Sequence, residues 1–342
     1  MNVVITILLT ILIFGIIIFI HEFGHFITAR MTGVKVNEFS LGMGPAILKK
    51  QGKKTLYSLR LLPIGGYCAM EGENEDSEDE NAFRSKSVPK RILICAAGAA
   101  MNIILGFILT LVTFSGEPYY SSSTVAVFNS ENALSKQSGL MVGDTIKKVN
   151  HTTIFTANDI VFELLRDDDG IVSMEVVRNG ETVRLETVQF QVSGEGEEKT
   201  LDLDFKVFAE DASFLGAVRQ TWGSTISLVR NTWVSIGDLI TGNIGISELS
   251  GPVGVGEVVG QAAAIGWKSL VNVAAFVSIS IGIFNLLPFP ALDGGRIVFL
   301  IIEGIRRKPI NPKIENWVNA AGLILLFALM LVVCFKDILG LF

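Results

Sequence analysis

Four long apolar runs constrain the fold of this 342-residue chain more than any other feature. The first run holds 18 residues without a charged side chain, which is long enough to cross a bilayer as a helix. The composition agrees, because 49% of the residues are hydrophobic and only 18% are charged. We therefore expect four membrane-spanning helices, at Val3–Ile20, Ile92–Phe114, Leu270–Leu287 and Val318–Phe335.

The end of the first run carries polar side chains in a specific pattern. His21, Glu22 and His25 form the sequence H-E-x-x-H directly after the apolar residues. Two histidines four residues apart lie on one face of a helix, so both imidazoles can reach one metal ion, and Glu22 beside them can hold a water molecule. The pattern predicts a zinc site.

The alternative is a chance occurrence of two structural histidines and a glutamate. Only three histidines occur in the whole chain. An unused His-Glu-His cluster in an apolar segment would carry a desolvation cost with nothing to offset it, and ionisable groups at membrane depth are normally kept for function. Both arguments favour the metal site over a chance occurrence.

The distribution of Lys and Arg predicts the orientation in the membrane. Residues 30–91 carry 11 of these side chains and residues 296–313 carry five, whereas residues 115–268 spread 11 over 154 positions. Short basic loops stay on the cytoplasmic side, so we expect a multi-pass protein of the cell (inner or plasma) membrane with its N-terminus, long insert and C-terminus outside. The first run lacks a basic leader and a small-residue cleavage site, so we expect it to be retained.

A zinc site needs a third protein ligand, and the third predicted span supplies a candidate. That span runs from outside to inside like the first, so Asp293 after it arrives at about the depth of His25. Pro288 and Pro290 end the helix, and the two glycines after Asp293 allow close approach of the backbone. An Asp-Gly-Gly sequence is most often an ordinary turn, but its agreement in depth with the first helix favours a ligand on the cytoplasmic side.

These residues resemble the site-2 protease family of intramembrane zinc metalloproteases, in particular the bacterial branch that includes the regulator-of-sigma-E protease. The resemblance covers essentially the whole chain. One departure is Ala99, where many members of the family have proline. The motifs that carry the resemblance are His21–His25, Asn285–Gly295, Ser250–Gly254, and Ala96–Gly98 with Asn102.

The resemblance implies an intramembrane protease in which Zn²⁺ is bound by His21, His25 and Asp293, with Glu22 as the general base. The implied substrates are single-span membrane proteins in regulated intramembrane proteolysis, either an anti-sigma factor already shortened outside the membrane or remnant signal peptides. The resemblance also implies that three residues help to hold the unwound substrate: Asn285, Pro288 and Pro290.

The segment between the first two spans predicts a β-hairpin. Val34–Leu41 and Thr55–Leu62 show partial apolar alternation, and Lys49–Lys54 is a plausible turn between them. A sheet edge near the site could bind an unwound substrate by strand addition, although an ordinary surface hairpin fits the pattern equally well. Family members are similar here, which favours a membrane-associated, substrate-binding hairpin with Gly42 and Gly44 among the binding residues. The following tract, residues 71–80, holds seven acidic residues and predicts a solvated loop.

The long insert predicts one small α+β domain. The sequence from Ser138 to Asn150 and the turn at Arg178–Glu181 resemble a PDZ domain, which could bind a peptide or a substrate ectodomain. We expect a helix at Asn158–Arg166 with Asn158 as its cap. The expected strands are Val125–Phe128, Thr145–Val149, Val172–Val177 and Thr182–Leu185.

The segment after the insert predicts an interfacial helix. Phe214–Leu239 is amphipathic, with Gly242 as a stop, and tryptophans accompany it as they do at membrane surfaces. The expected domains are residues 1–114 with the first two spans, 122–207 for the PDZ-like domain, 208–268 for the interfacial segment, and 269–342 with the last two spans.

The sequence therefore predicts an α-helical polytopic membrane protein with four transmembrane helices, a membrane-associated β-hairpin and one inserted extracytoplasmic PDZ-like α+β domain. Membrane lipid is an expected partner, and nucleic acid is not, because the basic residues at 306–308 are best explained as a topology anchor. Two other classes remain: a metal transporter or sensor, and a catalytically idle PDZ-bearing scaffold. Transport has no specific need for Glu22, and every expected catalytic residue is present, so both are less favoured.

Overall fold

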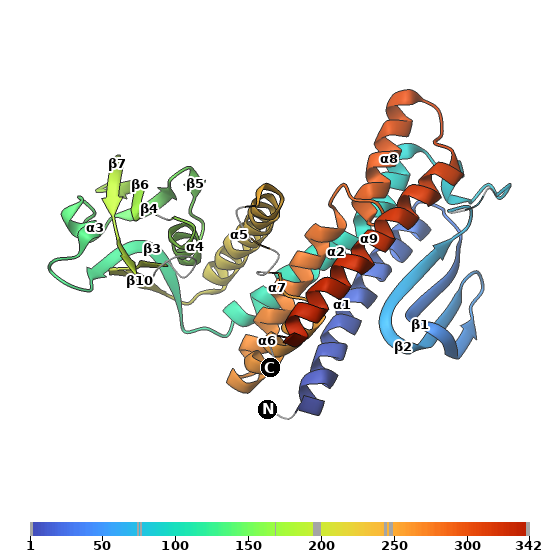
Figure 1. Ribbon diagram of the computed structural model, residues 1–342, viewed down its shortest axis with the longest axis horizontal. Coiled ribbons are helices and arrows are strands. Elements are labelled where there is room, and N and C mark those ends of the chain that lie inside the picture. The colour runs from blue at the N-terminus through green and yellow to red at the C-terminus, as the bar shows by residue number, and fades with distance from the viewer. Residues whose placement is uncertain are drawn as a thin grey trace. The chain divides into compact units, whose positions relative to one another are not determined.

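The computed structural model describes residues 3–73, 75, 77–167, 169–193, 200–242, 245 and 249–339 (Figure 1). The chain divides into two compact units. The first unit combines Met1–Leu109 with Val229–Phe342, and the second is Thr110–Leu228. The first unit contains the apolar helices, and the second contains the larger β-sheet.

Four helices are long and apolar enough to cross a membrane, as predicted. They run alongside one another (Figure 1), and many of their apolar side chains are exposed in the protein alone, as expected of surfaces that contact lipid. The chain therefore has the elements of a polytopic membrane protein. The four helices are α1 (Val3–Met31), α2 (Val88–Phe114), α7 (Trp267–Asn285) and α9 (Pro312–Leu339).

Two shorter helices of the first unit were not predicted. α6 (Pro252–Ile265) begins with proline at its first turn, a favoured position because that N–H has no helical partner. α8 (Asp293–Arg306) begins at the aspartate that the sequence suggested would follow a span, and it ends where Arg307 adopts a left-handed conformation. The Asp-Gly-Gly sequence is thus the first turn of a helix as well as the end of a loop.

The N-terminus of α6 is capped by a carboxylate from α9. Asp337 Oδ2 accepts hydrogen bonds from the backbone N–H groups of Gly251 and Gly254, both at 2.9 Å. Such a carboxylate satisfies orphan N–H groups and interacts favourably with the helix dipole. The side chain of Asp337 is only 5% exposed, so water replaces these bonds poorly.

The predicted hairpin is present and longer than expected. β1 (Val36–Gln51) pairs antiparallel with β2 (Leu56–Met70), and the connection at residues 52–55 overlaps the predicted turn at Lys49–Lys54. The register shifts repeatedly, so that Phe39 is paired with both Cys68 and Tyr57.

Aromatic contacts attach this hairpin to the first helix. The ring of Phe39 lies 5.0 Å from that of Phe26 on α1, centroid to centroid, and Tyr57 lies 6.1 Å from the same phenylalanine. Because Phe26 directly follows His25, this packing brings β1 and β2 to the polar end of α1.

The acidic tract after β2 is held by ion pairs, which the solvated-loop prediction did not anticipate. Lys35 Nζ lies 3.1 Å from Asp79 Oδ2 and 3.5 Å from Glu71 Oε2, and Glu73 pairs with Arg296 of α8. The described part of the tract contains no helix or strand, and Asn74 and Asp76 lie outside it. The short helix η1 (Phe83–Ser85) follows.

The second unit contains a six-stranded sheet of order β10-β3-β4-β6-β7, with β5 paired to β4. Buried apolar residues of the strands and of α4 form its core. The four predicted strands are all present, within β3, β4, β6 and β7. The smaller β8 (Gln191–Ser193) pairs with β9 (Thr200–Asp202). The sheet strands are β3 (Tyr119–Phe128), β4 (Thr145–Val149), β5 (Thr152–Thr153), β6 (Ile171–Arg178), β7 (Glu181–Gln189) and β10 (Phe205–Asp211).

The helices of this region are α3 (Leu134–Gln137), α4 (Ala157–Leu165) and α5 (Phe214–Thr241). The predicted cap of α4 was wrong: Thr156, not Asn158, is the N-cap, because it forms a reciprocal capping box with Asp159. Gly242 ends α5 as predicted, with a φ of +80° that favours glycine.

The cap on α6 gives a stability prediction. Asp337→Ala removes the acceptor of two N–H groups at the start of α6, so the free energy of unfolding should fall by about 1–2 kcal/mol. Thermal unfolding of the purified protein in detergent measures the change. Glu257→Ala, on the exposed side of the same helix, is the matched control, and equal melting temperatures for the two variants would contradict the capping role.

Candidate metal centre

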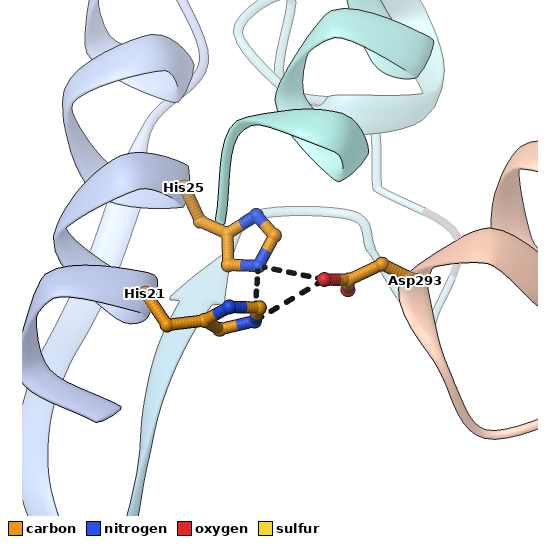
Figure 2. A group of neighbouring side chains, drawn as sticks. All are labelled: His21, His25 and Asp293. Carbon is orange, nitrogen blue, oxygen red and sulfur yellow. Dashed lines mark hydrogen bonds and ion pairs between the residues drawn. The ribbon is translucent and has the colours of Figure 1, made fainter. Parts of the chain in front are cut away.

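Three side chains from two helices meet at one point (Figure 2). His21 Nε2 and His25 Nε2 of α1 lie 3.2 Å apart, and Asp293 Oδ2 of α8 lies 3.2 and 3.3 Å from them, respectively. Among the histidine, cysteine, aspartate and glutamate side chains of the described residues, these three lie close enough together to hold one metal ion. The structure thus brings together the three predicted zinc ligands.

The three converging atoms fit a zinc ion. Asp293 Oδ2 is buried and has no hydrogen-bond donor among the residues described, although both Nε2 atoms are close. When both Nε2 atoms present lone pairs, a cation between them and the carboxylate oxygen satisfies all three atoms at once. Tetrahedral zinc with bonds of about 2.0–2.1 Å places neighbouring ligand atoms about 3.3–3.4 Å apart, close to the observed spacing.

A backbone carbonyl orients His25. Its Nδ1 lies 2.8 Å from the carbonyl oxygen of Ile94 on α2, and the side chain is buried. A carbonyl oxygen can only accept, so the proton of the neutral ring is on Nδ1 and Nε2 presents its lone pair toward His21 and Asp293. A ligand histidine is commonly fixed in this way by the group behind it.

Two glycines allow α1 and α2 to approach closely at the histidines. A Cβ added at Gly24 would lie 2.5 Å from the carbonyl oxygen of Ala97. A Cβ added at Gly98 would lie 2.8 Å from His21 Nε2 and closer still to His25 Nε2. The glycine of the Ala-Ala-Gly sequence in the second span is therefore explained by the space that the two imidazoles need.

A tight turn places Asp293. The backbone between α7 and α8 folds so closely that a Cβ at Gly294 would collide with the carbonyl oxygen of Leu287, and a Cβ at Gly295 with that of Phe289. Ala291 adopts a positive φ of 73°, and its N–H donates to Asn319 Oδ1 of α9 at 3.1 Å. Glycine is thus required at both positions after the aspartate.

The metal centre opens into a cavity of about 500 Å³. Glu22 lines it and lies against the hairpin, since a Cβ at Gly66 would be 3.1 Å from its Cγ. The lining therefore combines α1, α2, α7 and α8 with the C-terminal part of β2 and with Glu73 of the acidic tract. The lining residues beyond the three that meet are Glu22, Tyr67, Cys68, Ala69, Met70, Glu73, Cys95, Asn285, Ala291 and Arg296.

The predicted substrate-binding residues are divided by the structure. Asn285 lines the cavity, and its Nδ2 donates to the carbonyl oxygen of Ile281 at 3.0 Å. The other four, Pro288, Pro290, Gly42 and Gly44, are not among the residues that line it. Both glycines have positive φ angles, 85° and 83°, in a bend of β1. Their substrate role stays a prediction.

Several lining residues were missed by the sequence reasoning. Arg296 follows Asp293 by one helical turn and forms an ion pair with Glu73. A helix predicted to begin at Asp293 would have placed Arg296 on the same face as that aspartate. Burial acts against the guanidinium charge, but the nearby Glu73 carboxylate more than compensates and raises the pKa of Arg296. Burial also raises the pKa of the Cys68 thiol.

Comparison with known proteins places the site in a family context. The sequence model of peptidase family M50 matches residues 9–329. A Clostridium acetobutylicum protein, provisionally named a zinc metalloprotease, is 35% identical over 332 residues that cover 97% of both chains. Zinc metalloprotease RasP of Shouchella clausii is 30% identical, covering 98% of this chain and 99% of the relative. Regulator of sigma-W protease RasP of Bacillus subtilis is 29% identical with the same coverage.

The close approach at Gly98 gives a test of the site. Gly98→Ala would push its new methyl group into both imidazoles, and overpacking of this kind costs about 1–3 kcal/mol, so zinc affinity should fall about tenfold or more. Zinc content after dialysis against a chelator measures the effect. Gly15→Ala on α1, where a Cβ meets nothing within 4 Å, is the matched control. Equal zinc retention by both variants would contradict the geometry.

Proposed function

The chain belongs to peptidase family M50 and is a zinc metalloprotease of the site-2 protease family, and on that basis we propose that it hydrolyses peptide bonds within or near the transmembrane segment of single-span membrane proteins. One observation carries the proposal. His21 and His25 lie on α1, a helix apolar enough to cross a membrane, and their ring nitrogens meet an aspartate from a separate helix. A peptide bond hydrolysed at this metal centre would therefore lie within or near the membrane.

The residues of the site have separable roles in this proposal. His21, His25 and Asp293 hold zinc, which polarises a scissile carbonyl and acidifies a water molecule when it is bound. Glu22 lines the same cavity, next to one of the ligand histidines, and its carboxylate takes a proton from water and returns it to the leaving amine nitrogen.

The substrate lies along β2 in this proposal. Tyr67–Met70 line the cavity, and in the described part of the chain this stretch pairs only with β1, which leaves its other edge available. A helix must unwind before its peptide bonds can be cut, and its freed N–H and C=O groups need partners in a medium without water. Strand addition to β2 supplies them, with the amide of Asn285 as a further contact.

The proposed topology has the N-terminus, the insert and the C-terminus outside the cytoplasm and the metal centre toward the cytoplasmic side. His25 supports it, because it lies six residues before the end of α1 at Met31, where the basic segment begins. The short basic segment after α8 supports the same orientation.

Residues 122–207, within the second unit, are proposed as a PDZ-like domain that binds a peptide or a substrate ectodomain. Its mixed composition of strands and the helix α4 supports this assignment. The substrate proposed is an anti-sigma factor or a remnant signal peptide. The name of the Bacillus subtilis relative, a regulator of sigma-W protease, supports the first of these.

A substitution at Glu22 separates proteolysis from metal transport or scaffolding. Glu22→Gln should lower cleavage by about 10²–10⁴-fold, because the amide cannot accept the proton, while zinc binding is kept. Cleavage of a single-span substrate in detergent is followed by mass spectrometry of the products, with zinc measured by elemental analysis. Glu257→Gln on α6 is the control. Equal cleavage by the Glu22 variant and wild type would contradict the assignment.

Loss of the third ligand gives a second test. Asp293→Ala leaves two imidazoles and no carboxylate, so zinc and cleavage should be lost together. Elemental analysis of the purified variant measures the zinc content, and Asp79→Ala, which removes a carboxylate paired with Lys35 elsewhere in the same unit, is the control. Zinc at full occupancy in the Asp293 variant would contradict the ligand assignment.

A further inference from the structure

A buried asparagine of α2 lies beside His21, on the side of the ring away from Asp293. Asn102 on α2 has a relative exposure of 0%, and its Nδ2 lies 3.4 Å from His21 Nδ1. Its Oδ1 is buried and has no hydrogen-bond partner among the residues described. A buried amide oxygen without a partner is unfavourable, so we expect the native contact to satisfy it.

The backbone of Asn102 lies against the third span. Ser278 Oγ of α7 donates to the backbone oxygen of Asn102 at 2.8 Å, and a Cβ added at Gly282 would lie 3.4 Å from the Asn102 Cβ. Asn102 therefore lies where α2 packs on α7, with its amide directed at His21. A turn of the amide about its last bond exchanges Nδ2 and Oδ1 in front of His21.

The two orientations of this amide have opposite consequences for His21. With Nδ2 toward the ring, His21 Nδ1 must accept, so the proton of the neutral imidazole lies on Nε2 and blocks the lone pair that a metal needs. With Oδ1 toward the ring, Nδ1–H donates to the amide oxygen and Nε2 is free. Amide oxygen and nitrogen have nearly the same size, so both orientations fit the same space.

We propose that Asn102 is a positioning residue whose Oδ1 accepts the Nδ1–H of His21, fixes that tautomer and thereby sets the zinc affinity of the centre. The arrangement matches His25, whose Nδ1 faces the carbonyl oxygen of Ile94. Each histidine then has an oxygen behind it and presents Nε2 to Asp293, and the orphaned Oδ1 gains its partner. The proposal rests on the proposed zinc site at His21, His25 and Asp293.

Two substitutions separate the acceptor role from packing. Asn102→Leu keeps the size of the side chain and removes both polar atoms, so zinc should bind about 10–100-fold more weakly, the usual loss for a group behind a metal ligand. Asn102→Asp keeps acceptor oxygens and removes the donor, so affinity should stay within about tenfold of wild type. Ser278→Ala removes the bond to the Asn102 backbone only and should leave the affinity unchanged.

The measurement is the zinc dissociation constant of the full-length protein in detergent, from competition with a chromophoric chelator and without substrate. Thermal unfolding of each zinc-free variant checks that it is folded. Wild type must bind one zinc and Asp293→Ala must lose it. If either result is not obtained, the proposed zinc site is contradicted, independently of the role of Asn102.

With that control satisfied, three results overturn the proposal. Wild-type affinity in a folded Asn102→Leu variant shows that the amide has no influence on zinc. Equal loss in Asn102→Asp and Asn102→Leu shows that the acceptor oxygen is not what matters. Equal loss in Ser278→Ala and Asn102→Leu assigns the effect to packing between α2 and α7.

Discussion

The convergence of three lone-pair atoms in an apolar helix bundle is the constraint on which the rest of this structure depends. His21 Nε2, His25 Nε2 and Asp293 Oδ2 lie 3.2–3.3 Å apart, and Asp293 Oδ2 has no donor in the described part of the chain. Asp293 Oδ2 is buried, so solvent does not satisfy it. A bound cation resolves the arrangement, and zinc is the metal of the family to which the chain belongs.

The surrounding elements follow from that centre. Gly98 gives the imidazoles room, Ile94 orients one of them, and the glycines after Asp293 let α8 begin beside α1. Ion pairs then fix α8 and α9 around the cavity: Arg296 with Glu73, Arg91 with Glu303, and Arg84 with Glu315. These side chains are 24% exposed or less, and loss of one partner of a buried pair leaves an uncompensated charge, so the pairs hold α8 and α9 to their neighbours.

The sequence predicted the centre because its signals are local and periodic. The spacing of His21 and His25 follows from the helical repeat, and the apolar runs located all four long helices. It did not predict α8, because glycines at the start of a helix look like a turn until the close contacts of Gly294 and Gly295 are known. The partner of Glu73 is 223 residues away, and no local pattern indicates such a contact. The cap of α4 was misplaced by two residues because Thr156 and Asn158 are both good capping residues.

X-ray absorption at the zinc edge of the purified protein tests the central claim most directly. Cys68 and Cys95 line the same cavity as the three ligands, so a centre that includes sulfur is a real alternative. The account predicts one zinc with two imidazole nitrogens and carboxylate oxygen at about 2.0–2.2 Å and no sulfur. A sulfur neighbour at about 2.3 Å, or a spectrum without histidine scattering, would contradict it.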